Sequence, residues 1–151
     1  MRLASGERRN SGQWVLLRVA LVTCSELPQL DEDTRRLIAP LAAHGIAATP
    51  AIWDDSDVDW TLFDLVVVRS CWDYVRRRDE FLDWAGRVPR LANPAAVLAW
   101  NTHKGYLRDL GGRGIPIVET TWLEPTQEWT PRESGNWVIK PASSPPVIAR
   151  V

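Results

Sequence analysis

The sequence DLVVVRSCWDY, residues 64–74, predicts a buried strand that ends in a cluster of polar and aromatic side chains. Three consecutive valines are typical of a strand in a parallel sheet that is covered on both faces. Ligands of such sheets bind at the carboxyl ends of the strands. The residues that follow the valines therefore form the first candidate site: Arg69, Ser70, Trp72, Asp73 and Tyr74.

Two interpretations of this cluster remain open. The guanidinium of Arg69 can hold a substrate carboxylate through two parallel hydrogen bonds while the aromatic rings exclude water. Alternatively, Arg69 and Asp73 form an ion pair beside aromatic residues of the core. Several polar and aromatic groups converge at the expected edge of the sheet, and this favours substrate binding.

The flanking sequence alternates between strand and helix patterns. Strands are expected at 16–23 (LLRVALVT) and 46–53 (IAATPAIW), with a helix over 31–45 between them and another over 74–88. The first helix has acidic residues in its first turn and Gly45 as a C-cap. This order predicts an α/β fold, a Rossmann-like parallel sheet flanked by helices and joined by right-handed crossovers.

The pattern changes near residue 92, where we place a domain boundary. The first domain then covers 18–92, preceded at 1–17 by a flexible tail or a mis-assigned start. In the second domain, 93–151, one or two helices open at Asn93-Pro94 and are followed by strands at 115–123 and 136–141. The second of these strands delivers Lys140 to its end.

Composition excludes several classes of protein. The 151 residues are 45% hydrophobic and 25% charged with a net charge of −1, which is typical of a globular domain and provides no global field for nucleic acid or anionic membrane. No apolar run approaches the roughly 18 residues of a membrane-spanning helix. Cys24 and Cys71 fit reduced thiols in a cytoplasmic protein rather than a disulfide framework.

A metal site is not expected. The acidic loop with Asp54, Asp55, Asp57 and Asp59 lacks the glycine bend and bidentate glutamate of a calcium loop, so a solvated loop is the better interpretation. The arginines at 76–78 are typical of the solvent-exposed face of a helix.

The two lysines stand out because the chain has 16 arginines and only Lys104 and Lys140. A compact ammonium suits sites that a wide guanidinium does not fit. Two ammonium groups from separate elements can clamp a polyphosphate. Chance is the alternative explanation.

The ordered series RSxWDY, NP, WNxxK, GIPxxxT and VIKPA resembles the ATP-grasp superfamily over residues 18–142. The chain is most similar to bacterial ATP-grasp domain proteins that look like the ligase of the D-cycloserine pathway, and more distantly to glutathione synthetase. The resemblance implies a pre-ATP-grasp domain at 18–92 and the start of the nucleotide-binding domain at 93–151. It implies that Lys104 and Lys140 bind the phosphates of ATP and that Arg69 and its neighbours face the substrate.

Relatives of this kind activate a carboxylate as an acyl phosphate, which an amine then attacks, with ATP and Mg²⁺ as cofactors. The implied partners are a small carboxylate and a nucleotide, with no nucleic acid or membrane and with a homodimer as a further expectation. The sequence departs from the family after the second lysine. ASSPPVIARV stands in place of a Gly-rich loop, and the metal ligands of the family are absent, so no catalytic residue is assigned.

We therefore predict a truncated, inactive member of a carboxylate–amine ligase lineage. The alternative is a non-catalytic α/β module that binds a small acid at Arg69 or docks a partner. An inert gene remnant with the same fold is the third reading.

Overall fold

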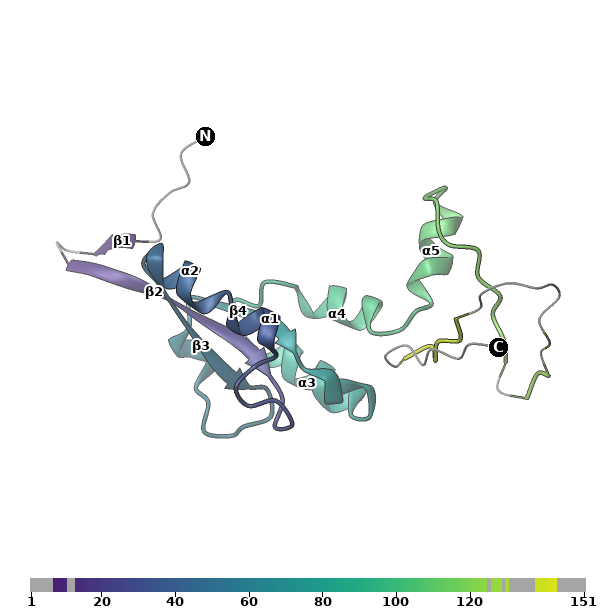
Figure 1. Ribbon diagram of the computed structural model, residues 1–151, viewed down its shortest axis with the longest axis horizontal. Helices are drawn as coiled ribbons and strands as arrows, with labels where there is room; N and C mark the ends of the chain where they lie inside the picture. Colours follow the sequence, from purple (N-terminus) through teal and green to yellow (C-terminus); the bar gives the residue numbers. More distant parts are fainter. Residues whose placement is uncertain (1–6, 11–12, 125, 129, 131–137, 144–151) are drawn as a thin grey trace. The chain divides into compact units, whose positions relative to one another are not determined.

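The computed structural model describes residues 7–10, 13–124, 126–128, 130 and 138–143 (Figure 1). Contacts divide the chain into two compact units, 1–98 and 99–151. The sequence predicts this division near residue 92. Within the described residues, no helix combines the length and apolar character needed to cross a membrane.

The first unit is built on a parallel sheet with β2 (Gln13–Thr23) at its centre. On one side β2 pairs with β3 (Ile46–Ile52), and on the other with β4 (Leu65–Ser70). A parallel bridge between Val66 and Leu91 adds the segment after α3 beside β4. The three predicted strands and the α/β class are confirmed.

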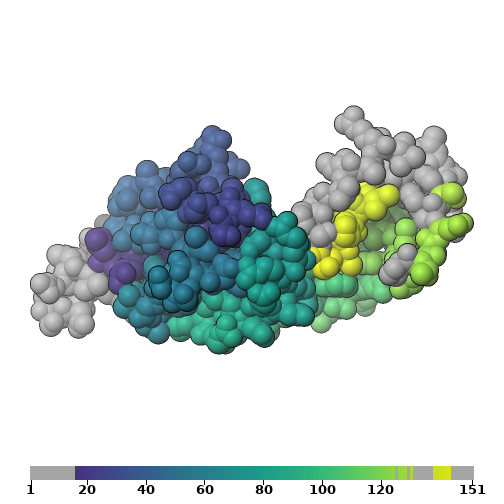
Figure 2. Space-filling view, turned by 90° about the horizontal axis from the view of Figure 1, so that it is seen from below, coloured from purple at the N-terminus to yellow at the C-terminus, as the bar shows by residue number. Residues whose placement is uncertain are grey.

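Helices cover both faces of this sheet (Figure 1). On one face, Ala20 and Val22 of β2 pack in a cluster with Phe81 and Trp84 of α3 (Arg78–Arg87). On the other, alternate β2 residues form a second cluster with side chains of α2 (Ile38–Ala43). In the space-filling view the blue and teal segments of this unit pack against one another (Figure 2). The alternation along β2 assigns each side chain to one of the two cores.

The helix predicted over 31–45 forms as two short helices, α1 (Glu32–Arg35) and α2. Pro40 has no N–H to donate to the carbonyl of Arg36, so the helical ladder is interrupted near this point. The predicted cap is confirmed: Gly45 has φ 74° and its N–H donates to the Ala42 carbonyl at 3.0 Å. The helix predicted from 74 begins later, because η2 (Trp72–Val75) is a 3₁₀ turn.

The amino-terminal segment differs from the predicted tail. β1 (Glu7–Asn10) pairs antiparallel with the first residues of β2, from Gln13 to Leu16. The expected boundary at residue 17 therefore lies inside a strand. Hydrogen bonds to β1 extend β2 beyond the part that pairs with β3 and β4.

In the described part of the second unit, the helices bury few side chains. α4 (Ala95–Asn101) begins in the first unit, and α5 (Tyr106–Gly112) follows the turn that carries Lys104. The strand predicted at 115–123 is wrong, since these residues have no strand pairing. Of the strand predicted at 136–141, residues 138–141 have none either, and 136–137 lie outside the described residues. Strand-forming sequence needs a hydrogen-bonding neighbour, and none occurs in the described part of this unit.

Candidate functional site

Arg69 and Ser70, at the carboxyl end of β4, contact the start of α1. Ser70 Oγ donates to Asp31 Oδ2, and the Thr34 hydroxyl donates to the same oxygen at 2.7 Å. The Thr34 N–H caps the helix by donating to Asp31 Oδ1 at 3.0 Å. Arg69 Nε lies 3.4 Å from Thr34 Oγ1. At this edge of the sheet, the guanidinium of Arg69 therefore belongs to one polar group with the hydroxyls of Ser70 and Thr34.

Asp31 is the acceptor at the centre of this group. The hydrogen bond from Ser70, followed by those from Thr34, holds the pKa of Asp31 well below its ordinary value. The residue before it, Leu30, is buried and has a positive φ of 66°, which is uncommon for leucine. The backbone turn at Leu30 directs the chain from the β2 end into the N-cap at Asp31.

The ion pair between Arg69 and Asp73 does not form. Within the described residues, the polar contact of the Arg69 side chain is with Thr34, and no carboxylate lies within ion-pair distance of its guanidinium. The Arg69 side chain is exposed. Its charge is thus available to an anion from solution.

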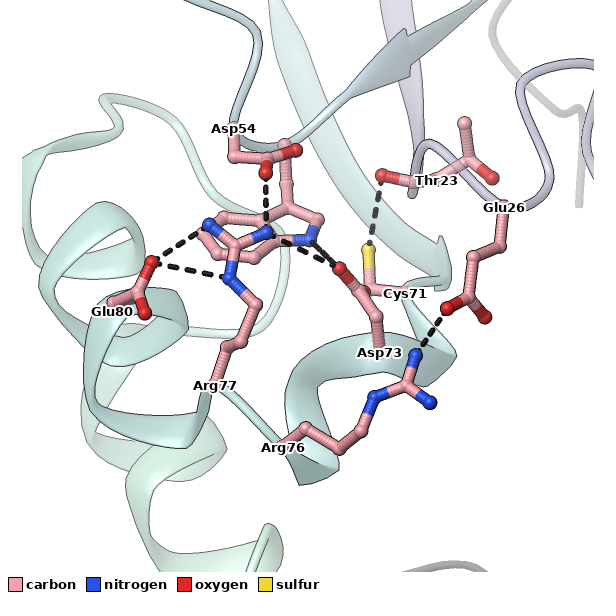
Figure 3. A network of polar contacts seen from close by, with 9 residues as sticks. Thr23, Glu26, Asp54, Cys71, Asp73, Arg76, Arg77 and Glu80 are labelled. Atoms are coloured by element: carbon pink, nitrogen blue, oxygen red, sulfur yellow. Dashed lines mark hydrogen bonds and ion pairs between the residues drawn. The ribbon is translucent and has the colours of Figure 1, made fainter.

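Asp73 belongs to a different group, in which it is buried. The indole N–H of Trp53 donates to both of its carboxylate oxygens, at 3.0 and 3.1 Å. Arg77 Nη1 lies 3.7 Å from Asp73 Oδ2 and also bonds Asp54, while its other nitrogens donate to Glu80 (Figure 3). The Arg77 guanidinium carbon lies 4.6 Å from the centre of the Trp53 ring. These contacts fix the loop after β4 against the loop after β3.

The two aromatic residues of the candidate site, Trp72 and Tyr74, also have different surroundings. Trp72 is 57% exposed, whereas Tyr74 packs on Phe81 with ring centroids 5.7 Å apart. Of the five residues predicted here, Arg69 and Ser70 therefore share one polar group, and Asp73 and Tyr74 face the core. Cys71 between them is buried, with a raised thiol pKa, and its Sγ lies 3.6 Å from the Thr23 carbonyl oxygen (Figure 3).

Both lysines belong to the second unit. The backbone N–H of Lys104 donates to the Ala142 carbonyl at 2.6 Å, which holds the segment of Lys140 beside the turn before α5. Burial, and then the charge of Lys140, lower the pKa of Lys104. Within the described residues, no three acidic, histidine or cysteine side chains gather in a metal-binding group.

Comparison with known proteins gives a consistent result. Residues 19–93 match the family described as D-cycloserine synthetase DcsG, N-terminal domain. Residues 19–93 are homologous to that domain. Cycloserine biosynthesis protein DcsG of Streptomyces lavendulae is 37% identical over 110 residues, which cover 71% of this chain and 37% of the relative.

A solved structure supports the same relationship. The crystal structure of D-cycloserine synthetase DcsG matches with a TM-score of 0.64 and 37% identity, over 69% of this chain and 36% of that one. The chain thus spans little more than a third of the length of DcsG. The similarity confirms the α/β architecture of the first unit.

Sequence reasoning missed several partners of the predicted residues. Asp31 and Thr34 carry the signal of a helix start, an acidic residue with a hydroxyl three positions later, but nothing local shows that Ser70 and Arg69 reach them. Trp53 gives a similar lesson, because it follows a strand and a buried indole N–H usually finds an acceptor. The position of that strand beside β2 decides that the acceptor is Asp73.

Proposed function

We propose that the chain belongs to a lineage of ATP-dependent carboxylate–amine ligases and that its first unit binds a small carboxylate at Arg69. One observation carries the proposal: in a domain homologous to that of DcsG, the guanidinium of Arg69 stands exposed at the strand end without a carboxylate partner among the described residues. A guanidinium presents paired N–H donors that match the two oxygens of a carboxylate.

The neighbouring contacts support this role for Arg69. Thr34 accepts from Nε, which orients the side chain and leaves the terminal nitrogens for a ligand. Ser70 is buried and bonded to Asp31, so it positions the edge without contacting the ligand itself. We propose the same indirect part for Asp73, through Trp53 and Arg77, while Trp72 is exposed enough to cover a bound molecule.

We further propose that Lys104 and Lys140 hold the phosphates of ATP. Lys104 is partly buried and the charge of Lys140 helps to lower its pKa, which supports a role for the pair at a negatively charged ligand. ATP supplies the phosphoryl group that activates a carboxylate, with Mg²⁺ as the counter-ion in this class of ligase. Within the described residues, acidic, histidine and cysteine side chains do not gather in a cluster of three or more that could hold the metal, so no residue is assigned to it.

We expect these 151 residues by themselves not to hydrolyse ATP. In the sequence, Pro145 and Pro146 follow the lysine segment, and proline has no N–H to offer a phosphate. This stretch lies outside the described residues. Tight Mg-ATP binding together with phosphate release by the 151-residue chain would contradict this expectation. We place the protein in the cytoplasm, in keeping with two buried, reduced cysteines.

The proposal is tested by measuring two ligands on two variants. Small carboxylates such as acetate, glycine and succinate are titrated by NMR, and Mg-ATP by calorimetry. Arg69→Ala is expected to remove carboxylate binding, and Lys140→Ala to weaken nucleotide binding. Arg35→Ala, an exposed arginine on α1, is the matched control and should change neither. Carboxylate binding that survives Arg69→Ala would refute the substrate site.

The alternative function is a non-catalytic α/β module that binds a small acid. It is favoured by the completeness of the sheet and both of its cores within the first unit. The same experiment separates the two functions. If Arg69→Ala abolishes carboxylate binding while wild type and Lys140→Ala show the same negligible response to Mg-ATP, the binding module is correct.

A further inference from the structure

The two cysteines of the chain occupy matching positions at the ends of two neighbouring strands. Cys24 directly follows β2, and Cys71 directly follows β4. The two strands are parallel, and their last paired residues are Thr23 and Ser70. Since each cysteine is the next residue along its strand, the register of the sheet brings Cys24 and Cys71 opposite each other.

Both cysteine side chains lie in the same core. Cys24 is 0% exposed and Cys71 is 3% exposed, and both belong to the cluster that packs against α3. The sulfur of Cys71 lies 3.6 Å from the carbonyl oxygen of Thr23, the residue joined by its peptide bond to Cys24 (Figure 3). Burial, then the charge of Asp73, then Cys24 raise the pKa of the Cys71 thiol. The register, the shared core and this electrostatic effect agree that the two thiols are neighbours.

The spacing of the two strands suits a disulfide. Disulfides join cysteines whose Cα atoms are about 4.4–6.8 Å apart. Adjacent strands of a sheet lie about 4.7–4.9 Å apart. Cysteines at matching positions of such strands, with side chains on one face, fall within the range for a disulfide. Both thiols are free in the structure, which therefore holds the reduced form of the pair.

An oxidant can reach the pair through a local opening at the strand ends. The residues that follow the two cysteines, Ser25 and Trp72, are both exposed. The turn after Cys24 is closed by a hydrogen bond from the Leu27 N–H to the Cys24 carbonyl, at 3.0 Å. Turns of this kind open at a lower free energy than the whole fold. Burial slows the reaction, because the reactive form of a cysteine is the thiolate.

We propose that Cys24 and Cys71 form a reversible disulfide when the protein meets a peroxide. One thiol takes an oxygen from hydrogen peroxide, the O–O bond breaks, and a sulfenic acid and one water form. The other thiol attacks that sulfur, so the S–S bond forms, the S–O bond breaks and a second water leaves. Two thiols thus give two electrons to one peroxide, and a dithiol reverses the change by exchange. The inference goes beyond the proposed function and does not depend on Arg69 or the lysines.

The test is a count of free thiols in the 151-residue chain. The reduced protein is treated with excess hydrogen peroxide at neutral pH, catalase removes the peroxide, and the protein is unfolded in urea with N-ethylmaleimide. Mass spectrometry should show a monomer that has lost two hydrogens and takes up no maleimide. After treatment with dithiothreitol it should take up two. A protein that keeps both thiols, or loses them to sulfinic acid or to links between chains, would overturn the proposal.

Single variants separate a disulfide from independent oxidation of the two thiols. Dimedone, which traps sulfenic acids, is present during the peroxide treatment. In Cys24→Ala and in Cys71→Ala the remaining cysteine should be labelled, because no second thiol captures its sulfenic acid. Wild type should be labelled several-fold less. Equal labelling of wild type and both variants would show that the two thiols are oxidised independently and would refute the disulfide.

The disulfide would tie the turn after β2 to the turn after β4. Because the two turns could then open only together, amide hydrogen exchange at residues 24–28 and 71–75 should be slower in oxidised than in reduced wild type. Residues 43–45, in the turn after α2, contain no cysteine and are the internal control. Equal exchange of the two turns in both forms would contradict a link between them.

Discussion

The two units of this chain differ in the strand pairing and the burial of their apolar residues. In the first unit, the strands β2, β3 and β4 pair with one another, and both of their faces are covered by side chains from helices and loops. In the described part of the second unit, strand-like sequence is unpaired and its apolar side chains are exposed: Ile115, Ile117, Val118, Leu123, Val138 and Ile139. Both cores lie at or before Leu98.

The difference shows that apolar, β-branched sequence is not sufficient for a strand. The valines of β4 form one because β2 lies beside them and supplies hydrogen bonds. Residues 115–124 have similar composition but no such neighbour among the described residues. Burial and pairing therefore arise together, and stability should concentrate in the first unit.

The largest expected effect contrasts one side chain from each unit. Phe81 is 1% exposed and Val118 is 83% exposed. Phe81→Ala should lower the free energy of unfolding by about 3–5 kcal/mol, because it leaves a cavity between α3 and the sheet. Val118→Ala should change it by less than about 0.5 kcal/mol. Urea unfolding followed by circular dichroism measures both. A Val118→Ala protein as unstable as Phe81→Ala would mean that the second unit has a core of its own.

A smaller effect sharpens the comparison within the first unit. Trp53→Phe and Trp84→Phe remove the same atoms from two buried indoles, but only the N–H of Trp53 is bonded to a carboxylate. Trp53→Phe should therefore cost about 1.5–3 kcal/mol more than Trp84→Phe, the range for a hydrogen bond to a charged group. Thermal and urea unfolding of the pair give the difference. Equal losses would show that the Trp53–Asp73 contact contributes nothing to stability.

The next prediction concerns the loss of stability at low pH. The pKa of Asp31 is lowered in the folded chain, first by Ser70 and then by Thr34, so its contribution to stability is present above the unfolded pKa of about 3.9 and is lost as pH falls toward the folded value. Ser70→Ala removes the hydrogen bond that lowers the pKa of Asp31 the most. The free energy of unfolding of this variant should therefore fall less steeply than that of wild type below about pH 5.

Urea unfolding at a series of pH values measures these slopes. Ser25→Ala, an exposed serine in the turn after β2, is the control and should follow wild type. A Ser70→Ala protein whose profile runs parallel to that of wild type would show that Ser70 does not stabilise the Asp31 carboxylate.

Much of the first unit was predictable because its signals are local. Neighbouring residues in the chain carry each of these signals. They are the apolar runs of β2 and β4, the acidic residues at the start of α1 and the glycine that ends α2. The strand order, with β2 between β3 and β4, was not predicted, because it depends on contacts between distant segments. The split between α1 and α2 was missed, although Pro40 lies inside the predicted helix and a proline in a helix interior indicates an interruption.

The candidate site was less predictable because its contacts span distant segments. Arg69 and Asp73 stand four residues apart, yet their side chains join different groups, one with Thr34 and one with Trp53. From the four-residue spacing alone, an ion pair between Arg69 and Asp73 is as good a prediction as the two separate contacts that the structure has. The choice depends on which strand lies on each side of β2, and this is a property of the whole sheet.

The smallest expected effect concerns the lysines of the second unit. Burial and then the charge of Lys140 lower the pKa of Lys104. Lys140→Met removes the second cause, so the pKa of Lys104 should rise but stay below its ordinary value because burial remains. Since the chain has only two lysines, reductive ¹³C-methylation gives two lysine signals, and NMR titration follows each one. Arg113→Gln, an exposed cation in the same unit, should leave the pKa of Lys104 unchanged. If Lys140→Met also leaves it unchanged, the two ammonium groups are not close enough to clamp one phosphate chain.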